Sequence, residues 1–253
     1  MEDYQRHLLF NLIPLDCLSE NQVLKKVQRW IIRKEKKRIF YLNVHNTVIS
    51  YKNPNYLTII NSGDLVYPDG WGPVIAMRLL GNKCFKRVNA ADYIDKLLEI
   101  LNLEKAKLYF LGSEKETLIQ TIKTIHDKYK GITISGYHHG FFKKSEEKII
   151  VSEIKSLEPN LVFIGMGTPK QEQWVNNNWD FLPQAVYWCV GGLFGYVSEV
   201  KSRAPYWMRE LSLEWLYRLI QEPSRLGVRY TVENALFIFF LLKFLVKKVK
   251  FII

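Results

Sequence analysis

Short apolar runs alternate along most of the chain with segments whose apolar residues recur at helical spacing. IFYLN (39–43), KLYFLG (107–112) and LVFIGMG (161–167) have the length and composition of buried strands. Between them, apolar residues return every three to four positions, as they do from 118 to 125. This alternation predicts an α/β fold: an open, mostly parallel, Rossmann-like sheet with helices on both faces.

The same pattern supplies further elements. Strands are predicted at DLVYPD (64–69), ITISGY (132–137) and AVYWCVGG (185–192). Ser19 and Gln22 are spaced as a capping box, which predicts a helix beginning just after Ser19.

The last fifth of the chain has a different character. Residues 201–253 contain no strand-like run, so we expect an α/β core over 1–200 and a helical appendage over 201–253. From Ala235 to Val246 the sequence is apolar except at Lys243, and further lysines follow. The pattern favours a helix that lies in a membrane interface, with packing on the core or on a second subunit as the alternative.

Charge points to a polyanionic partner. The formal net charge is +11, and residues 201–253 carry ten Lys and Arg against four Glu. More than half of the excess therefore belongs to the appendage. Nucleic acid, an anionic membrane or a phosphorylated substrate would each fit this balance.

Cysteine usage and the N-terminus bear on the compartment. Cys17, Cys84 and Cys189 are far apart, odd in number and without a CxxC pair, which predicts neither a disulfide framework nor a zinc site. A reducing compartment fits. The first residues lack a basic, signal-like start, and no run of about 18 apolar residues occurs.

Candidate binding residues follow the strands, because ligands of open α/β sheets lie outside the strands' carboxyl ends. Gly165 and Gly167 precede Thr168, Pro169 and Gln171, which are placed as an N-cap, a first helical residue and the third position of a capping box. Such a helix start can bind an anion. It can equally be a simple helix cap. Gly112 and Gly191 mark two further corners of the expected crevice.

Asp69, in Pro-Asp-Gly, is the candidate general base, although this tripeptide is also a common turn. His138 and His139 resemble half of a metal site without a partner at ligand-like spacing. Asp-x-Asp does not occur, which argues against a sugar transfer that depends on Mn²⁺ or Mg²⁺. We expect no metal site and no cofactor.

Arginines recur through the appendage. They can bind phosphate bidentately, or form a solvated face paired with Glu210, Glu214 and Glu222. The set comprises Arg203, Arg209, Arg218, Arg225 and Arg229.

Together these segments resemble the WecG/TagA/CpsF glycosyltransferases from about Leu9 to Tyr230. The resemblance is carried by PDG (68–70), RV…AD (87–92), GYHHGFF (136–142), PNLVFIGMGTPKQEQW (159–174) and APYWMRELSLEWLYRLIQEPSRLGVRY (204–230).

The resemblance implies a metal-independent, inverting transfer of an N-acetylmannosamine-type sugar from a UDP-sugar. The acceptor would be N-acetylglucosamine on a polyprenyl diphosphate at the inner, cytoplasmic face of the membrane. Asp69 matches the family's proposed base, and Asn43 matches its Asn after the first core strand. Arg87, Asp92 and Gln171 match polar active-site segments.

The resemblance also implies that Arg218, Arg225 and Arg229 close over the diphosphate. Two departures concern the sugar pocket: Tyr41 stands where relatives often have Thr, and Val88–Asp92 reads VNAAD where they often have VTGTD. Both leave the donor sugar open.

Two rival functions differ in what they require. A non-catalytic basic module that binds RNA or membrane polyanions explains the charge but not PDG together with GTPKQE. An epimerase or dehydrogenase needs G-x-G-x-x-G after the first strand, which is missing. We therefore expect no nucleic-acid partner, and the apolar tail permits a homo-oligomer.

Overall fold

A computed structural model describes residues 6–84, 86–200, 202–210 and 213–250, except for the side chains of Glu210, Arg225 and 248–250. Its centre is a six-stranded sheet of order β4-β3-β8-β7-β5-β6, in which every neighbouring pair is parallel. The strands are β3 (Lys37–Leu42), β4 (Leu65–Pro68), β5 (Lys107–Gly112), β6 (Thr133–His138), β7 (Leu161–Gly165) and β8 (Val186–Cys189). An antiparallel hairpin of β1 (Arg6–Leu9) and β2 (Ile13–Asp16) lies beside β4. The predicted sheet is confirmed.

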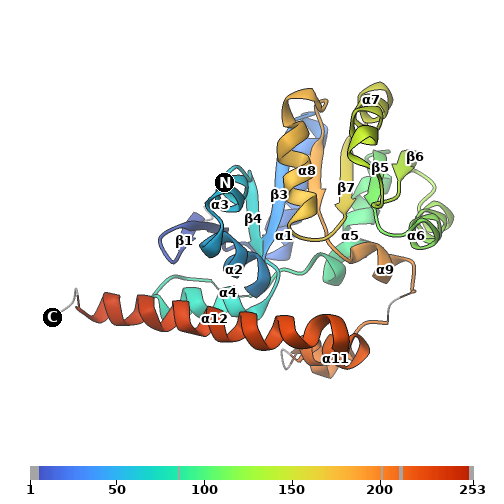
Figure 1. The fold of residues 1–253 in the computed structure, drawn as a ribbon. Coiled ribbons are helices and arrows are strands. Elements are labelled where there is room, and N and C mark those ends of the chain that lie inside the picture. Colours follow the sequence, from blue (N-terminus) through green and yellow to red (C-terminus); the bar gives the residue numbers. More distant parts are fainter. Residues whose placement is uncertain (1–5, 85, 201, 211–212, 251–253) are drawn as a thin grey trace.

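Helices cover both faces of the sheet (Figure 1). One face packs on α1 (Glu20–Ile32), α5 (Ala90–Leu103), α6 (Lys115–Lys128) and α9 (Leu193–Val197). The other packs on α2 (Val44–Lys52), α3 (Pro54–Asn61), α4 (Trp71–Leu79), α7 (Glu147–Leu157), α8 (Lys170–Asn178) and α12 (Pro223–Lys250). Two short helices, α10 (Tyr206–Glu210) and α11 (Glu214–Gln221), precede α12.

Alternation along each strand explains the two-sided burial. Phe40 and Leu42 of β3 enter one hydrophobic core while Ile39 enters the other, and all three are fully buried. Successive strand side chains point to opposite faces, so a strand covered on both faces must be apolar at nearly every position. The capping box that opens α1 is also present, with Ser19 accepting from the Gln22 backbone.

The C-terminal helix α12 runs below the sheet in the view of Figure 1 and packs along α2. Phe240 stacks on Tyr51 with ring centroids 3.9 Å apart, and Phe237 and Phe244 lie against Phe10. One face of α12 therefore belongs to the core, as the packing alternative required. No helix among the described residues is long and apolar enough to cross a membrane.

The expectation of unpaired cysteines is wrong. Cys17 and Cys84 form a disulfide across a sequence separation of 67, with Cα atoms 5.0 Å apart, and only Cys189 is free. The pairing arises because the hairpin packs beside α4, which brings the residue after β2 next to the segment after α4. Because this proximity results from tertiary packing, the spacing of the cysteines in the sequence could not predict it.

Candidate active site

The carboxyl edge of the sheet gathers the residues that were singled out after each strand. Asn43 follows β3 and Asp69 follows β4, while Gly112, Gly165 and Gly191 close or follow β5, β7 and β8. The backbone N–H of Asp69 donates to the carbonyl of Leu42 at 2.9 Å, which holds the end of β4 beside that of β3. The predicted common edge is confirmed.

Asn43 and Asp69 form the polar centre of this edge. Asn43 is the N-cap of α2, where its side chain accepts from the backbone of Asn46 at 3.1 Å, and it also hydrogen-bonds to Asp69. A glycine follows Asp69, and a Cβ at Gly70 would lie only 3.6 Å from the Cβ of Asn43. The two side chains are thus neighbours, and the Pro-Asp-Gly turn places a carboxylate in the crevice.

Burial raises the pKa of Asp69 from its ordinary value to about 6. The positive charges of Arg218 and Arg87 and the Asn43 hydrogen bond act in the opposite direction, while Glu214 adds to the increase. A carboxyl group with a pKa near 6 is ionised at neutral pH and still basic enough to accept a proton from a hydroxyl group. These are the properties of a general base.

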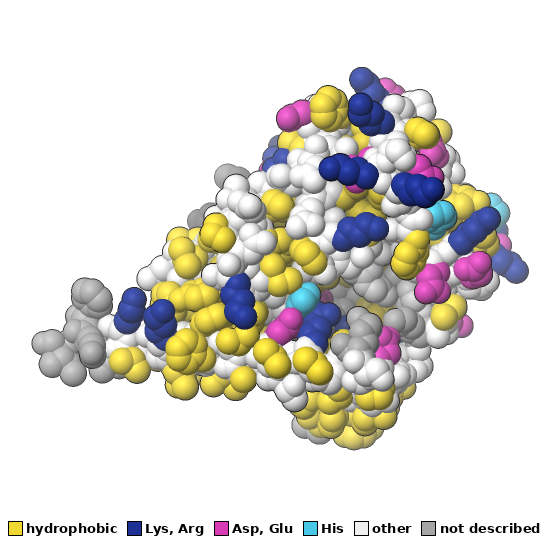
Figure 2. All heavy atoms as spheres, viewed as in Figure 1, with side chains coloured by type: hydrophobic (Ala, Val, Ile, Leu, Met, Phe, Trp, Pro, Cys, Tyr) yellow, Lys and Arg dark blue, Asp and Glu magenta, His cyan; other side chains and the backbone are white. Residues whose placement is uncertain are grey.

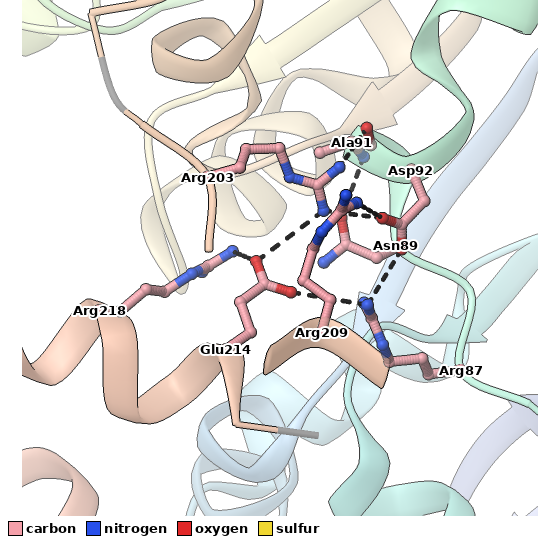
Figure 3. A network of polar contacts seen from close by, with 8 residues as sticks. All are labelled: Arg87, Asn89, Ala91, Asp92, Arg203, Arg209, Glu214 and Arg218. Atoms are coloured by element: carbon pink, nitrogen blue, oxygen red, sulfur yellow. Dashed lines mark hydrogen bonds and ion pairs between the residues drawn. The ribbon is translucent and has the colours of Figure 1, made fainter. Parts of the chain in front are cut away.

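Four arginines stand around two carboxylates, Asp92 and Glu214 (Figure 3). Asp92 contacts Arg87, Arg203 and Arg209 at 3.1, 2.8 and 3.0 Å. Glu214 contacts Arg218 at 2.8 Å and Arg87 at 3.6 Å. We call this group, Arg87, Asp92, Arg203, Arg209, Glu214 and Arg218, the arginine cluster.

The arginine cluster lies at the same edge as Asp69. The backbone of Val88, next to Arg87, donates to the carbonyl of Pro68 at 2.6 Å, and Arg218 exerts the largest single charge effect on the pKa of Asp69. Three of its arginines come from α10, α11 and the segment before them, so the appendage completes a site that begins on the sheet.

Charge in the arginine cluster is unbalanced. Four guanidinium groups face two carboxylates, an excess of two positive charges. The Nε–H groups of Arg203, Arg209 and Arg218 are buried and unpaired within the described part of the chain. Buried donors without partners are rare in folded proteins, so the cluster has the charge and the donors to bind a multiply charged anion such as a diphosphate.

The predicted capping box at Thr168 and Gln171 is wrong. Helix α8 begins at Lys170 and has no side-chain cap. Thr168 instead donates to Glu172 at 3.0 Å, and the fully buried Gln171 donates to Glu172 at 2.7 Å and accepts from the Gly191 backbone at 3.0 Å. Both side chains turn toward the Glu172 carboxyl, which is fully buried, and this burial cannot be seen from the spacing of the motif. Gln171 therefore holds the crevice wall together, with both ends of its amide already engaged.

The glycines at this edge have different roles. A Cβ on Gly112 would collide with the Gly165 carbonyl, and one on Gly165 would lie 2.9 Å from the Gly191 carbonyl oxygen. These glycines let neighbouring loops pack backbone against backbone. Gly167, at φ +79°, and Gly192 have no atom within 4 Å of the place of a Cβ, so a ligand can approach the backbone there.

Replacing Gly112 by Ala should therefore destabilise the fold, whereas Gly192→Ala should not. Gly112 has φ +136°, a region that is almost exclusive to glycine, and it lacks room for a methyl group; Gly192 has φ −83° and open space. We expect Gly112→Ala to lower the free energy of unfolding by about 3 kcal/mol or more. Urea denaturation of both variants tests this, and equal stabilities would contradict it.

Other predicted residues lie elsewhere. Arg229 pairs with Glu233 at 3.4 Å, and Glu233 contacts His45 of α2 at 2.7 Å, so Arg229 helps to dock α12. The Arg225 side chain lies outside the described part. His138 and His139 contact one another at the end of β6, the edge strand at the other end of the sheet from β4. The described residues contain no group of three or more His, Cys, Asp or Glu that could bind a metal. The sequence analysis considered Glu214 only as a surface ion-pair partner of the arginines, and did not predict its position between Arg87 and Arg218 in the arginine cluster.

Comparison with known proteins agrees with this geometry. The model of the family described as "Glycosyl transferase WecG/TagA/CpsF family" matches residues 9–250. The chain belongs to this family. It is therefore a glycosyltransferase, and the resemblance drawn from the sequence is confirmed.

Two similar curated proteins share the name N-acetylglucosaminyldiphosphoundecaprenol N-acetyl-beta-D-mannosaminyltransferase. The protein of Bacillus subtilis (strain 168) is 33% identical over 174 residues, which is 69% of this chain and 67% of the relative. That of Staphylococcus aureus (strain MW2) is 27% identical over 217 residues, 85% of each chain.

Proposed function

We propose that this glycosyltransferase moves an N-acetylmannosamine-type sugar from a UDP-sugar to N-acetylglucosamine on a polyprenyl diphosphate, with inversion and without a metal. The observation that carries the proposal is the position of Asp69, a carboxyl with a raised pKa, beside the cationic arginine cluster. The names of the relatives support the choice of the transferred sugar and of the acceptor.

The chemistry is a direct displacement. Asp69 accepts the proton of the acceptor hydroxyl, while the oxygen of that hydroxyl bonds to the anomeric carbon of the donor sugar. The bond from that carbon to the diphosphate breaks, and UDP leaves with the electron pair. Arg218 and its neighbours in the arginine cluster stabilise the charge that develops on the leaving diphosphate. Attack opposite the leaving group inverts the anomeric centre.

The acceptor lipid also gives the appendage (201–253) a role distinct from that of the core (1–200). The side of α12 that faces away from the core is apolar and exposed, and Figure 2 shows these hydrophobic side chains gathered along α12. The exposed residues are Val228, Val232, Ile238, Phe239, Leu242 and Val246. We infer that this surface, with Lys243 and Lys247, holds the enzyme at the inner face of the cell membrane as a peripheral protein. Without a membrane the same surface can form a homo-oligomer.

A double substitution, Phe239→Glu with Leu242→Glu, should release the protein from vesicles of phosphatidylglycerol and phosphatidylcholine. These side chains are 60% and 55% exposed, so the change keeps the packing of Phe237 on Phe10 and of Phe240 on Tyr51, unlike deletion of α12. We expect the bound fraction in a sedimentation assay to fall at least about tenfold. Ile32→Glu on α1, where the side chain is 60% exposed, is the control. Undiminished binding of the double variant would place the anchor elsewhere.

The test of the proposed function is UDP release from a panel of UDP-N-acetylhexosamines and UDP-hexoses. The full-length protein is assayed on vesicles with a lipid-diphosphate-linked N-acetylglucosamine, with and without EDTA. EDTA-resistant release that needs both one donor and the acceptor supports the proposal. No release with any donor would contradict it and favour a polyanion-binding module, which salt-sensitive RNA binding would then identify.

A further inference from the structure

Tyr41 occupies an unusual place in the crevice. It lies on β3, two residues before Asn43, and its side chain is partly exposed at the carboxyl edge. Its phenolic oxygen is 3.2 Å from the Thr168 hydroxyl and accepts from the Gln171 amide at 3.3 Å. The phenol therefore links the strand that leads to Asn43 with the loop before α8.

The phenolic proton has only a weak acceptor in the protein. Thr168 is its one hydrogen-bonding acceptor among the described residues, and that hydroxyl already accepts from Asn46 at 3.0 Å and donates to Glu172. Hydroxyl pairs prefer about 2.7–2.8 Å, so the 3.2 Å contact is long. A ligand oxygen that enters the crevice can compete for this proton.

The phenol is also a donor throughout the physiological pH range. Burial raises the pKa of Tyr41 well above its ordinary value, and the nearby carboxylates of Glu172 and Asp69 raise it further. Tyr41 is therefore neutral and cannot take over the role of base from Asp69. The effect of Asp69 also shows that the phenol lies within electrostatic reach of the candidate reaction centre.

Shape adds a second constraint. A Cβ on Gly191 would lie 2.7 Å from the Tyr41 oxygen, so the phenol fills the space that a side chain at 191 would need. Beside it, Gly167 and Gly192 leave open space. Tyr41 thus forms a rigid wall next to the part of the edge where a ligand can approach the backbone.

We propose that Tyr41 determines donor-sugar specificity: its hydroxyl donates to an oxygen of the transferred sugar, and its ring limits the size of the sugar pocket. This inference rests on the proposed function, because it needs a UDP-sugar whose sugar lies between Asp69 and the loop before α8. It differs from a purely structural role, in which Tyr41 would only connect β3 to Thr168 and Gln171.

Two variants separate the hydrogen bond from the ring. Tyr41→Phe keeps the ring and removes the donor, and we expect KM for the preferred UDP-sugar to rise about 3- to 10-fold. Tyr41→Thr keeps a hydroxyl but removes the ring, and we expect the ratio of kcat/KM between the preferred and the next-best donor to fall about tenfold or more.

Tyr56→Phe is the matched control. Tyr56 is fully buried in the same network, where its hydroxyl accepts from Asn46 at 3.0 Å, but it does not reach the crevice. A structural disturbance of the network should change the rates for all donors by the same factor. The control should therefore leave the donor ratio unchanged even where it lowers stability.

The donor panel, run on all three variants and the parent protein, decides the matter. A donor ratio altered in Tyr41→Thr and a KM increase in Tyr41→Phe, with an unchanged ratio in Tyr56→Phe, support the inference. If the parent protein transfers a sugar and the Tyr41 variants keep both its ratio and its KM, the inference alone fails. If the parent protein transfers no sugar, the proposed function fails, and the inference fails with it.

Discussion

Asp69→Asn should reduce sugar transfer by about 10²- to 10⁴-fold while UDP binding persists. The substitution removes the proton acceptor but keeps the size of the side chain and its place beside Asn43. The arginine cluster, which is expected to bind the diphosphate, is untouched. The measurement is kcat for transfer together with the Kd for UDP from calorimetry.

The pH profile gives the same assignment independently. Because burial raises the pKa of Asp69 to about 6, the carboxylate is present above that pH and becomes protonated below it. We expect kcat/KM to fall about tenfold per pH unit below pH 6 and this limb to disappear in Asp69→Asn. A bound diphosphate offsets the positive charge of Arg218, so the limb in kcat should lie at higher pH than the limb in kcat/KM.

Asp95→Asn is the control for this change. Asp95 lies on α5, where its side chain is 67% exposed and pairs with Lys128 at 2.6 Å outside the arginine cluster, and the same chemical replacement there should leave kcat unaltered. If Asp69→Asn retained the parent rate and pH profile, Asp69 would not be the base.

The sheet could be predicted from the sequence because its evidence is local. Strands buried on both faces are continuous apolar runs, and parallel strands require the intervening helices, so the alternation specified the architecture. The same logic placed Asn43 and Asp69 together, since residues that directly follow parallel strands meet at one edge.

The remaining features depend on contacts between distant segments or on burial in the folded protein. The Cys17–Cys84 disulfide and the packing of α12 on Tyr51 each join elements that the sequence separates. The turn of Thr168 and Gln171 toward Glu172 is local in sequence, but it depends on the burial of that carboxyl in the folded protein. The spacing of Thr168 and Gln171 alone predicted a capping box. The carboxyl that competes for both side chains belongs to Glu172, one residue beyond the motif, and it is buried.

The arginine cluster could be predicted from the sequence in part. The density of arginines in the appendage predicted an anion site, and three of these arginines do gather in the arginine cluster. Their division could not be predicted: Arg203, Arg209 and Arg218 join Arg87 around Asp92 and Glu214, whereas Arg229 pairs with Glu233 on α12. Which arginines face the crevice depends on how α10 and α11 fold back on the sheet.

Arg218→Ala should lower kcat/KM and weaken UDP binding by about 10- to 100-fold each, because a charge-assisted hydrogen bond to phosphate is lost. Arg218 also exerts the largest charge effect favouring ionised Asp69, and its loss leaves Glu214 without its 2.8 Å partner. Both changes raise the pKa of Asp69. The acid limb of kcat/KM should therefore move to higher pH in this variant.

Arg218→Lys separates the two effects. A lysine keeps the positive charge and should hold the acid limb near its parent position, but it lacks the planar fork and should recover little of the UDP affinity. Arg33→Ala, directly after the end of α1, removes an equal charge from a side chain that is 67% exposed, and it should change neither quantity. A limb that stays in place in Arg218→Ala would show that Arg218 does not act on Asp69. Unaltered UDP affinity would remove Arg218 from the diphosphate site, and the excess charge of the arginine cluster would then have to serve another anion.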